Sequence, residues 1–143
     1  MNNIDFHIEN VDIPDLDPEF LRLWIKAVVE SQQKQIGEIT YIFCSDDFLL
    51  DINMKYLNHN YYTDIITFNY NIDKVLNGDV YISYDTVISN AEEFSQGNVK
   101  DELERVIIHG VLHLAGFNDK TEDEQVKMTK MEDWALAMRK RFT

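Results

Sequence analysis

The sequence predicts an α+β fold (mixed α/β) in which helices pack against a single mixed β-sheet of about four strands. Two kinds of segment support this prediction. Short segments that alternate between apolar and polar residues, or that are rich in β-branched and aromatic residues, are typical of strands. Longer segments with apolar residues three and four positions apart are typical of amphipathic helices. They follow the order β-α-β-α-β-β-α-α-α along the chain.

The first third of the chain predicts two strands with a helix between them. Residues 4–8 alternate between apolar and polar, as in a half-buried strand. Residues 17–19 (Asp-Pro-Glu) form a typical helix start, with an N-cap aspartate and a proline at the first helical position. We expect this helix to run to about Gln35, where Gly37 stops it, and residues 38–44 to form a buried strand.

The middle of the chain predicts a short helix and a pair of strands. Ser45 is placed to N-cap the helix, and a polar, aromatic loop follows at residues 58–62. Residues 64–70 and 78–83 both predict strands. Because the connection at residues 71–77 is short, we expect these two strands to pair antiparallel.

Three helices are predicted in the last third. Residues 85–96 are amphipathic and end at Gly97. Asp101 followed by Glu104 resembles a helix start, and we expect it to open a second helix with a strongly apolar centre. Residues 121–124 (Thr-Glu-Asp-Glu) fit a capping box, which opens the last helix.

Length and composition indicate a folded protein without a membrane segment. With 143 residues, of which 45% are hydrophobic, we expect a single domain that spans residues 1–143. No apolar run approaches the roughly 20 residues that a membrane span needs, and the N-terminus lacks the features of a signal peptide. The single cysteine, Cys44, lies in an apolar segment and is predicted to be a buried thiol rather than a nucleophile. A cytoplasmic protein is the simplest expectation.

The formal net charge is −13, from 26 acidic and 13 basic residues. Nucleic-acid-binding proteins gain affinity by neutralising phosphates with lysine and arginine, and they usually carry a basic face. The charge therefore argues against nucleic-acid binding unless a local basic patch, a metal ion or a partner compensates for it.

The stretch at residues 109–119 carries the clearest chemical pattern. His109 and His113 are four positions apart, so that they lie on one face of a helix and can share one metal ion. Gly116 is a natural residue for turning the chain out of the helix, and the turn can bring the carboxylate of Asp119 to the same ion. Two histidines and a carboxylate with an open fourth position are typical of catalytic zinc sites. Two core or surface histidines are the alternative, but the glycine and the carboxylate favour the metal site.

Residues 109–116 (His-Gly-Val-Leu-His-Leu-Ala-Gly) resemble the signature of the YbeY family of metal-dependent endoribonucleases, which are rRNA maturation factors of bacteria. That signature reads H-G-x-L-H-L-x-G-[Y]-D-H. Two further blocks are similar to the family in the same order: residues 63–68 to T-D-V-L-S-F and residues 78–83 to G-D-I-x-I-S. Asn53 also stands at the family's distance before the first block.

The resemblance implies an α/β fold with one Zn²⁺ in a cleft beside the sheet and a zincin-like histidine-bearing helix. It also implies single-strand-directed endoribonuclease activity in small-subunit rRNA 3′-end maturation and ribosome quality control. RNA and the ribosome or ribosomal proteins would then be the partners. His109 and His113 take the first two metal positions, and Asp119 stands where the family usually has a histidine. The harder carboxylate can shift the preference toward manganese or iron.

Separate residues are candidates for binding phosphate and for transferring protons. The family usually has an arginine, suited to gripping phosphate, at the position occupied by Leu57. His59 can replace it, or it can be an ordinary exposed loop histidine. Asp64 and Asp79 stand at the ends of matching blocks and are candidates for the general acid and base, although such carboxylates often only cap turns.

Two other functions compete with RNA cleavage. A metalloprotease with the H-E-x-x-H motif needs a glutamate as general base after the first histidine, and this chain has Gly110 there. A non-catalytic ribosome-associated factor, in which the metal only stabilises the fold, would be consistent with the strong acidity and with Leu57.

Overall fold

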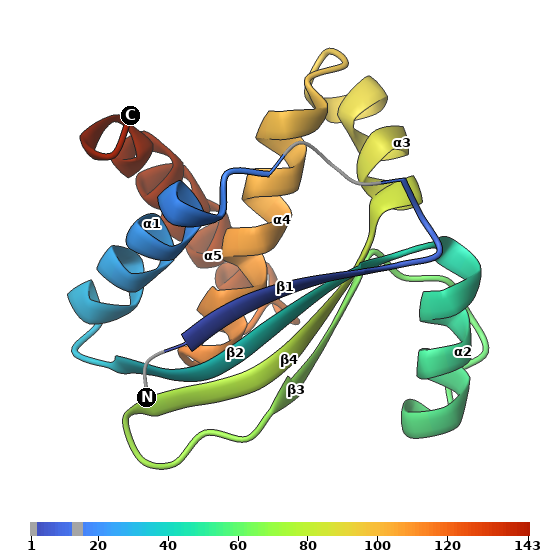
Figure 1. Ribbon diagram of the computed structural model, residues 1–143, viewed down its shortest axis with the longest axis horizontal. Coiled ribbons are helices and arrows are strands. Elements are labelled where there is room, and N and C mark those ends of the chain that lie inside the picture. The colour runs from blue at the N-terminus through green and yellow to red at the C-terminus, as the bar shows by residue number, and fades with distance from the viewer. Residues whose placement is uncertain (1–2, 13–15) are drawn as a thin grey trace.

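The computed structural model describes residues 3–12 and 16–143, which form a four-stranded sheet and five α-helices (Figure 1). The predicted α+β fold class and the predicted order of elements are confirmed. In chain order the elements are β1 Asn3–Glu9, α1 Pro18–Ser31, β2 Gln35–Cys44, α2 Asp46–Leu57, β3 Ile65–Asn69, β4 Val75–Ser83, α3 Tyr84–Phe94, α4 Val99–Leu114, α5 Glu122–Met138 and a short 3₁₀ helix, η1 Arg139–Arg141.

The sheet is mixed and has the strand order β1-β2-β4-β3. Strands β1, β2 and β4 are parallel to one another. Strand β3 pairs antiparallel with β4, which confirms the pairing that the short connection predicts. Because β3 is the last strand in this order, it forms one edge of the sheet.

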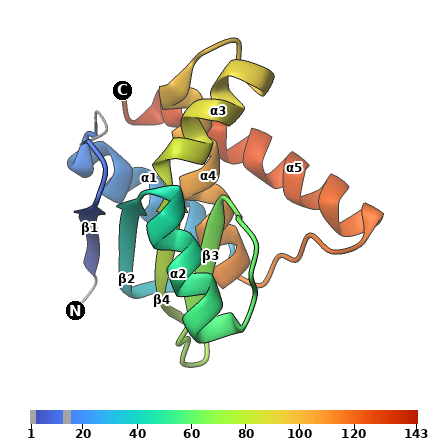
Figure 2. The same cartoon turned by 90° about the vertical axis from the view of Figure 1, so that its right-hand side faces the viewer.

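Helices cover the two faces of the sheet unequally (Figures 1 and 2). Helices α1 and α4 pack on one face, α5 packs against α4, and all three share the main hydrophobic core with the sheet. Buried hydrogen bonds tie these layers together: Trp24 Nε1 of α1 donates to the Ala135 carbonyl of α5 at 2.7 Å, and Tyr41 Oη of β2 donates to the Ile107 carbonyl of α4 at 2.9 Å. Helix α2 lies on the other face, over a smaller apolar cluster that includes Cys44 and Leu49.

Helix α4 packs unusually closely on the sheet because Gly110 has no side chain. A Cβ atom on Gly110 would lie 2.7 Å from Val80 Cγ1 and 3.1 Å from Ile65 Cδ1. Gly110 therefore faces the sheet, whereas His109 and His113 project from another side of the helix. The close contact fixes the distance between the histidines and strand β3.

The predicted helix caps are confirmed in three helices. Asp17 accepts a hydrogen bond from the Phe20 amide at the start of α1, where Pro18 is the first residue. The Ser45 hydroxyl accepts from the Phe48 amide at the start of α2. Helix α5 begins with a complete capping box between Thr121 and Glu124. Each cap satisfies backbone amides that have no partner inside the helix.

The first helix is shorter than the sequence predicts. Helix α1 ends at Ser31, and Gln35 already belongs to β2. Gln33 has a φ of 58°, so that the chain leaves the helix before it reaches a glycine. Gly37 lies inside β2, where the pairing with β4 is irregular between Ile36 and Ile39. The glycine therefore marks a break in strand register, not the end of a helix.

Two further elements begin two or three residues before their predicted start. Helix α4 starts at Val99, because the Asn98 side chain accepts the Asp101 amide and provides the cap. Strand β4 starts at Val75 within the segment predicted as a connection, because its first residues pair with β2. In both cases the element begins before the residues from which it was predicted, which are Asp101 in α4 and residues 78–83 in β4.

Cys44 is fully buried, as predicted. Burial, followed by the charge of Asp46, raises the pKa of its thiol to about 12. A thiol with so high a pKa is almost entirely protonated at neutral pH and is a poor nucleophile. Within residues 3–12 and 16–143, no helix has both the length and the apolar character needed to cross a membrane.

Candidate metal centre

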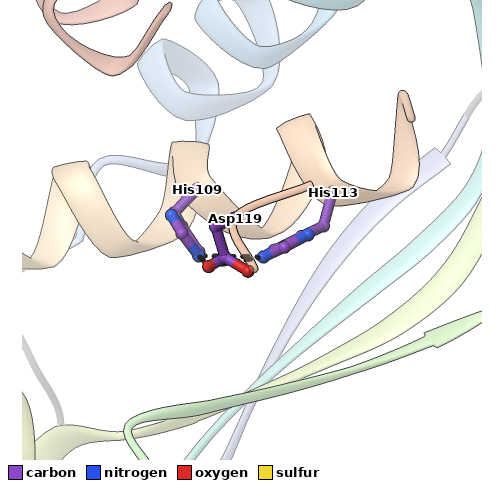
Figure 3. Close-up of side chains that lie close together, drawn as sticks. All are labelled: His109, His113 and Asp119. Atoms are coloured by element: carbon purple, nitrogen blue, oxygen red, sulfur yellow. Dashed lines mark hydrogen bonds and ion pairs between the residues drawn. The ribbon is translucent and has the colours of Figure 1, made fainter. Parts of the chain in front are cut away.

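Three of the predicted site residues meet at one point beside helix α4. The Nε2 atoms of His109 and His113 lie 3.0 Å apart. Asp119 Oδ2 lies 3.2 Å from His109 Nε2 and 3.3 Å from His113 Nε2. The two imidazoles project from the same side of α4, and the Asp119 carboxylate lies between them (Figure 3). These residues form a group that can hold a metal ion.

A turn with Gly116 at its centre brings Asp119 back to the helix that carries the histidines. The Phe117 amide donates to the Leu112 carbonyl and the Gly116 amide donates to the His113 carbonyl, each at 3.0 Å. This pattern is the Schellman motif, and it needs a residue with positive φ, which Gly116 provides at 105°. The predicted role of Gly116 as the residue that turns the chain is confirmed.

The spacing of the three donor atoms fits one transition-metal ion. Donors held tetrahedrally at roughly 2.0–2.1 Å from a zinc ion lie roughly 3.3–3.4 Å apart. The observed separations of 3.0, 3.2 and 3.3 Å need only a small outward movement to reach that spacing. The side chains of His109, His113 and Asp119 are 20%, 23% and 38% exposed, so that solvent reaches the centre.

A buried carboxylate behind the cluster holds one of the histidines in place. His109 Nδ1 donates to Glu132 Oε2 at 2.6 Å, which leaves Nε2 turned toward the other donors. The second oxygen of Glu132 accepts from Arg105 at 2.8 Å, and Arg105 also donates to Asp133 at 2.8 Å. A carboxylate on the far nitrogen fixes the orientation of a metal-binding histidine and makes it more basic.

The electrostatic surroundings of His109 are predominantly negative. Burial lowers the pKa of His109, but the hydrogen bond and charge of Glu132, with the charges of Asp119 and Asp64, outweigh burial and raise that pKa. The same carboxylates that attract a proton to the imidazole also attract a cation. A divalent ion at this point would offset their mutual repulsion.

The structure places the three candidate catalytic residues in different environments. Asp64 immediately precedes β3, and its charge acts on His109. His59 lies in the exposed α2–β3 connection and lines a cleft beside β3, together with Leu57. Asp79 is not brought to the cluster, because Val80, next to it in β4, faces α4 and successive side chains alternate between the faces of a strand.

The position of Asp79 gives a prediction about both stability and activity. Burial raises the pKa of its carboxyl group, because the folded protein disfavours the ionised form. That cost is present above the raised pKa and absent below the ordinary value of 3.8. We expect Asp79→Asn to raise the midpoint of thermal unfolding at pH 7, to leave it unchanged at about pH 3, and to leave RNA cleavage unaffected. If the folded variant loses cleavage, Asp79 takes part in the reaction and this prediction is wrong.

Glu132 and Arg105 are functional candidates that the sequence reasoning missed. A signal for Glu132 is present in α5, where the helix buries Met128, Ala135 and Met138. A glutamate on that apolar face needs a buried partner, because an unpaired buried charge is strongly unfavourable. The identity of the partner lies 23 positions earlier in the chain and is visible only in the fold.

Known proteins support the assignment that this geometry suggests. The family described as Endoribonuclease YbeY matches residues 3–140. Endoribonuclease YbeY of Bacteroides thetaiotaomicron is 50% identical over 136 residues, which cover 95% of this chain and 98% of that protein. Endoribonuclease YbeY of Porphyromonas gingivalis is 44% identical over 138 residues, with 96% and 91% covered.

A solved structure agrees on the fold. The solution structure of a Thermotoga maritima protein matches this chain with a TM-score of 0.62 at 24% identity and covers 95% of this chain and 92% of its own. The sequence match extends through both histidines, the third donor and the helix that carries Glu132. This chain therefore belongs to the YbeY family of endoribonucleases.

Proposed function

We propose that this protein is a single-strand-directed endoribonuclease that hydrolyses phosphodiester bonds with one zinc ion held by His109, His113 and Asp119. Its role in the cell is the 3′-end maturation of small-subunit rRNA and ribosome quality control, with the ribosome or ribosomal proteins as partners. The observation that supports this most directly is the solvent-accessible group of three donors, 3.0–3.3 Å apart, in a chain of an endoribonuclease family.

The residues of the chain divide the chemistry between them. Two imidazoles and one carboxylate would hold the ion, and Glu132 keeps His109 in the orientation and tautomer that present Nε2. When bound, the ion supplies a Lewis acid for a phosphoryl oxygen and lowers the pKa of a water molecule to about 7. Asp64 is the better candidate for accepting a proton, because it adjoins the cleft and acts electrostatically on His109.

The third donor bears on which metal the centre prefers. A carboxylate is a harder donor than the imidazole that the resemblance leads one to expect at position 119, and hard donors favour manganese and iron(II) relative to zinc. Aspartate also ligates zinc well, and donor separations of 3.0–3.3 Å are compatible with that ion. Zinc is therefore the proposed ion, with manganese or iron as the alternatives to be tested beside it.

The structure adds a reason against the metalloprotease alternative. A protease of the H-E-x-x-H type needs a carboxylate at position 110. Gly110 faces the sheet, and a side chain there would collide with Val80. A glutamate could not occupy this position without moving α4 away from the strands.

The test is removal of the metal from the purified protein, followed by its return. Chelation is expected to stop cleavage of a labelled single-stranded RNA, and about one equivalent of zinc, manganese or iron is expected to restore it, with a duplex of the same sequence left intact. Circular dichroism shows whether the metal-free protein stays folded. A protein that stays folded but loses cleavage uses the metal in the reaction, whereas in the non-catalytic alternative the metal only stabilises the fold. If the folded protein fails to cleave RNA after zinc, manganese or iron is returned, the proposal is refuted.

A further inference from the structure

A cleft of about 430 Å³ runs along strand β3, the edge strand of the sheet. Its walls come from α2, from the α2–β3 connection, from β3 and from the α4–α5 connection, and they include Asn53, Leu57, His59, Tyr61, Thr67 and Lys120. Figure 2 shows the two connections, in green and orange, on the same side of the molecule.

The cleft adjoins the metal centre at two points. Lys120, in one wall, directly follows Asp119. Ile65, also in the lining, packs against Gly110, which directly follows His109. A chain lying in this cleft would therefore pass beside the three metal-binding residues.

The charge of the cleft differs from that of the whole chain, which is −13. The residues that the structure places in its lining include no carboxylate, and the groups that can carry positive charge there are Lys120 and His59. Lys120 is exposed and makes no ion pair within the described part of the chain, whereas Arg105 and Arg139 are held by carboxylates. Lys120 is therefore available to an anionic ligand.

Leu57 leaves the cleft without a cation at the position where the resemblance predicts one, and Lys120 can supply that charge. The resemblance predicts a phosphate-gripping arginine at position 57, and Leu57 lies in the same cleft as Lys120. The cation that position 57 lacks is thus present elsewhere in the lining of the same cleft, on the connection that also carries Asp119.

The α2–β3 connection presents an aromatic surface to the cleft. The rings of His59 and Tyr61 stack with centroids 5.0 Å apart and planes 18° apart, and Tyr61 Oη lies 3.0 Å from His59 Nδ1. Tyr61 is 56% exposed. The side chain of Asn53, itself buried, donates to the Tyr61 carbonyl at 2.8 Å, and the backbone carbonyl of Asn53 accepts from the His59 amide at 3.1 Å. The loop that presents the pair is therefore braced from within the protein.

We propose that this cleft is the binding groove for the single-stranded RNA substrate, with a phosphate on Lys120 and a base stacked on the His59–Tyr61 pair. A lysine beside an exposed aromatic surface is the combination by which proteins bind single strands without reading a sequence. The inference rests on the proposed function, because it places the substrate of that reaction. Lys120 is a positioning residue that compensates for the leucine at position 57.

Binding and cleavage are measured separately. Fluorescence anisotropy with a labelled single-stranded RNA of about eight nucleotides, checked for integrity on a gel, gives the affinity at several salt concentrations. We expect Lys120→Gln to weaken binding about fivefold to tenfold at low salt and to reduce the slope of log affinity against log salt by about 0.7. Tyr61→Ala is expected to weaken binding at least about fivefold and to leave that slope unchanged.

Two matched variants make the test specific. Lys55→Gln removes the same charge from the exposed last turn of α2, outside the lining of the cleft, and is expected to bind as the wild type does. Adding Leu57→Arg to Lys120→Gln is expected to restore the affinity, because it returns a cation to the same cleft. Unchanged binding by Lys120→Gln would overturn the proposal, and so would an equal loss in Lys55→Gln, since net charge alone would then explain both.

The two proposals can fail independently. If the wild-type protein binds RNA in this manner but fails to cleave it when zinc, manganese or iron is added, the proposed reaction is refuted and the groove proposal stands. A wild-type protein that cleaves RNA, with a Lys120→Gln variant that binds and cleaves as well, would refute the groove and leave the reaction intact.

Discussion

Replacing His113 with alanine is expected to remove the metal ion and to lower the rate of RNA cleavage by about three orders of magnitude or more. Two donors cannot hold an ion at the affinity of three, and without it no water is activated near neutral pH. The side chain of His113 is 23% exposed, so that its loss leaves no large cavity and the fold should persist. Elemental analysis of the purified protein measures the first effect, and a cleavage time course measures the second.

A second histidine provides the control. His7 lies exposed on β1, outside the metal-binding group, and His7→Ala is expected to keep about one ion per chain and full activity. A His113→Ala variant that retains the same metal content as the wild type would show that the ion, if present, is bound elsewhere. If the wild-type protein takes up no zinc, manganese or iron on titration, the proposal of a metal centre at these residues is refuted.

Replacing Glu132 is expected to weaken metal binding without removing any donor. Glu132→Gln keeps the size of the side chain but removes the charge that makes His109 more basic, and it replaces a charge-assisted hydrogen bond to His109 by a weaker neutral one. We expect metal affinity to fall about tenfold to a hundredfold, measured by competition with a coloured chelator. Cleavage at saturating metal should fall much less than it does in His113→Ala.

Asp133→Asn is the matched control for this prediction. Asp133 neighbours Glu132 in α5 and shares the same partner, Arg105. Among the described residues no hydrogen bond or ion pair joins it to His109, and it is 61% exposed. Removing its charge is expected to leave metal affinity unchanged, because an exposed ion pair contributes little. If both variants lose the same metal affinity, then that affinity depends on the ion pairs between Arg105 and α5 and not on the orientation of His109.

The local features of the site could be predicted from the sequence because their causes lie within a few residues. Two histidines four positions apart share a helix face in any helix, and a glycine after the last turn allows the Schellman motif that returns Asp119 to them. The caps at Asp17, Ser45 and Thr121 were predictable for the same reason. Where the segments themselves were ambiguous, as at Gln35 and Gly37, the prediction of boundaries was wrong.

Contacts between distant segments depend on how strands pair and how helices settle on the sheet, and no local pattern encodes them. The register of β4 turns Val80 toward α4 and Asp79 away from it. The packing of α5 places Glu132 against His109, and the folding of two connections to one side places Lys120 and His59 in the same cleft. The sequence by itself thus determined the three candidate metal-binding residues, because short-range geometry fixes them. Only the tertiary structure decided what supports and surrounds them, because those partners are brought together by the packing of the whole chain.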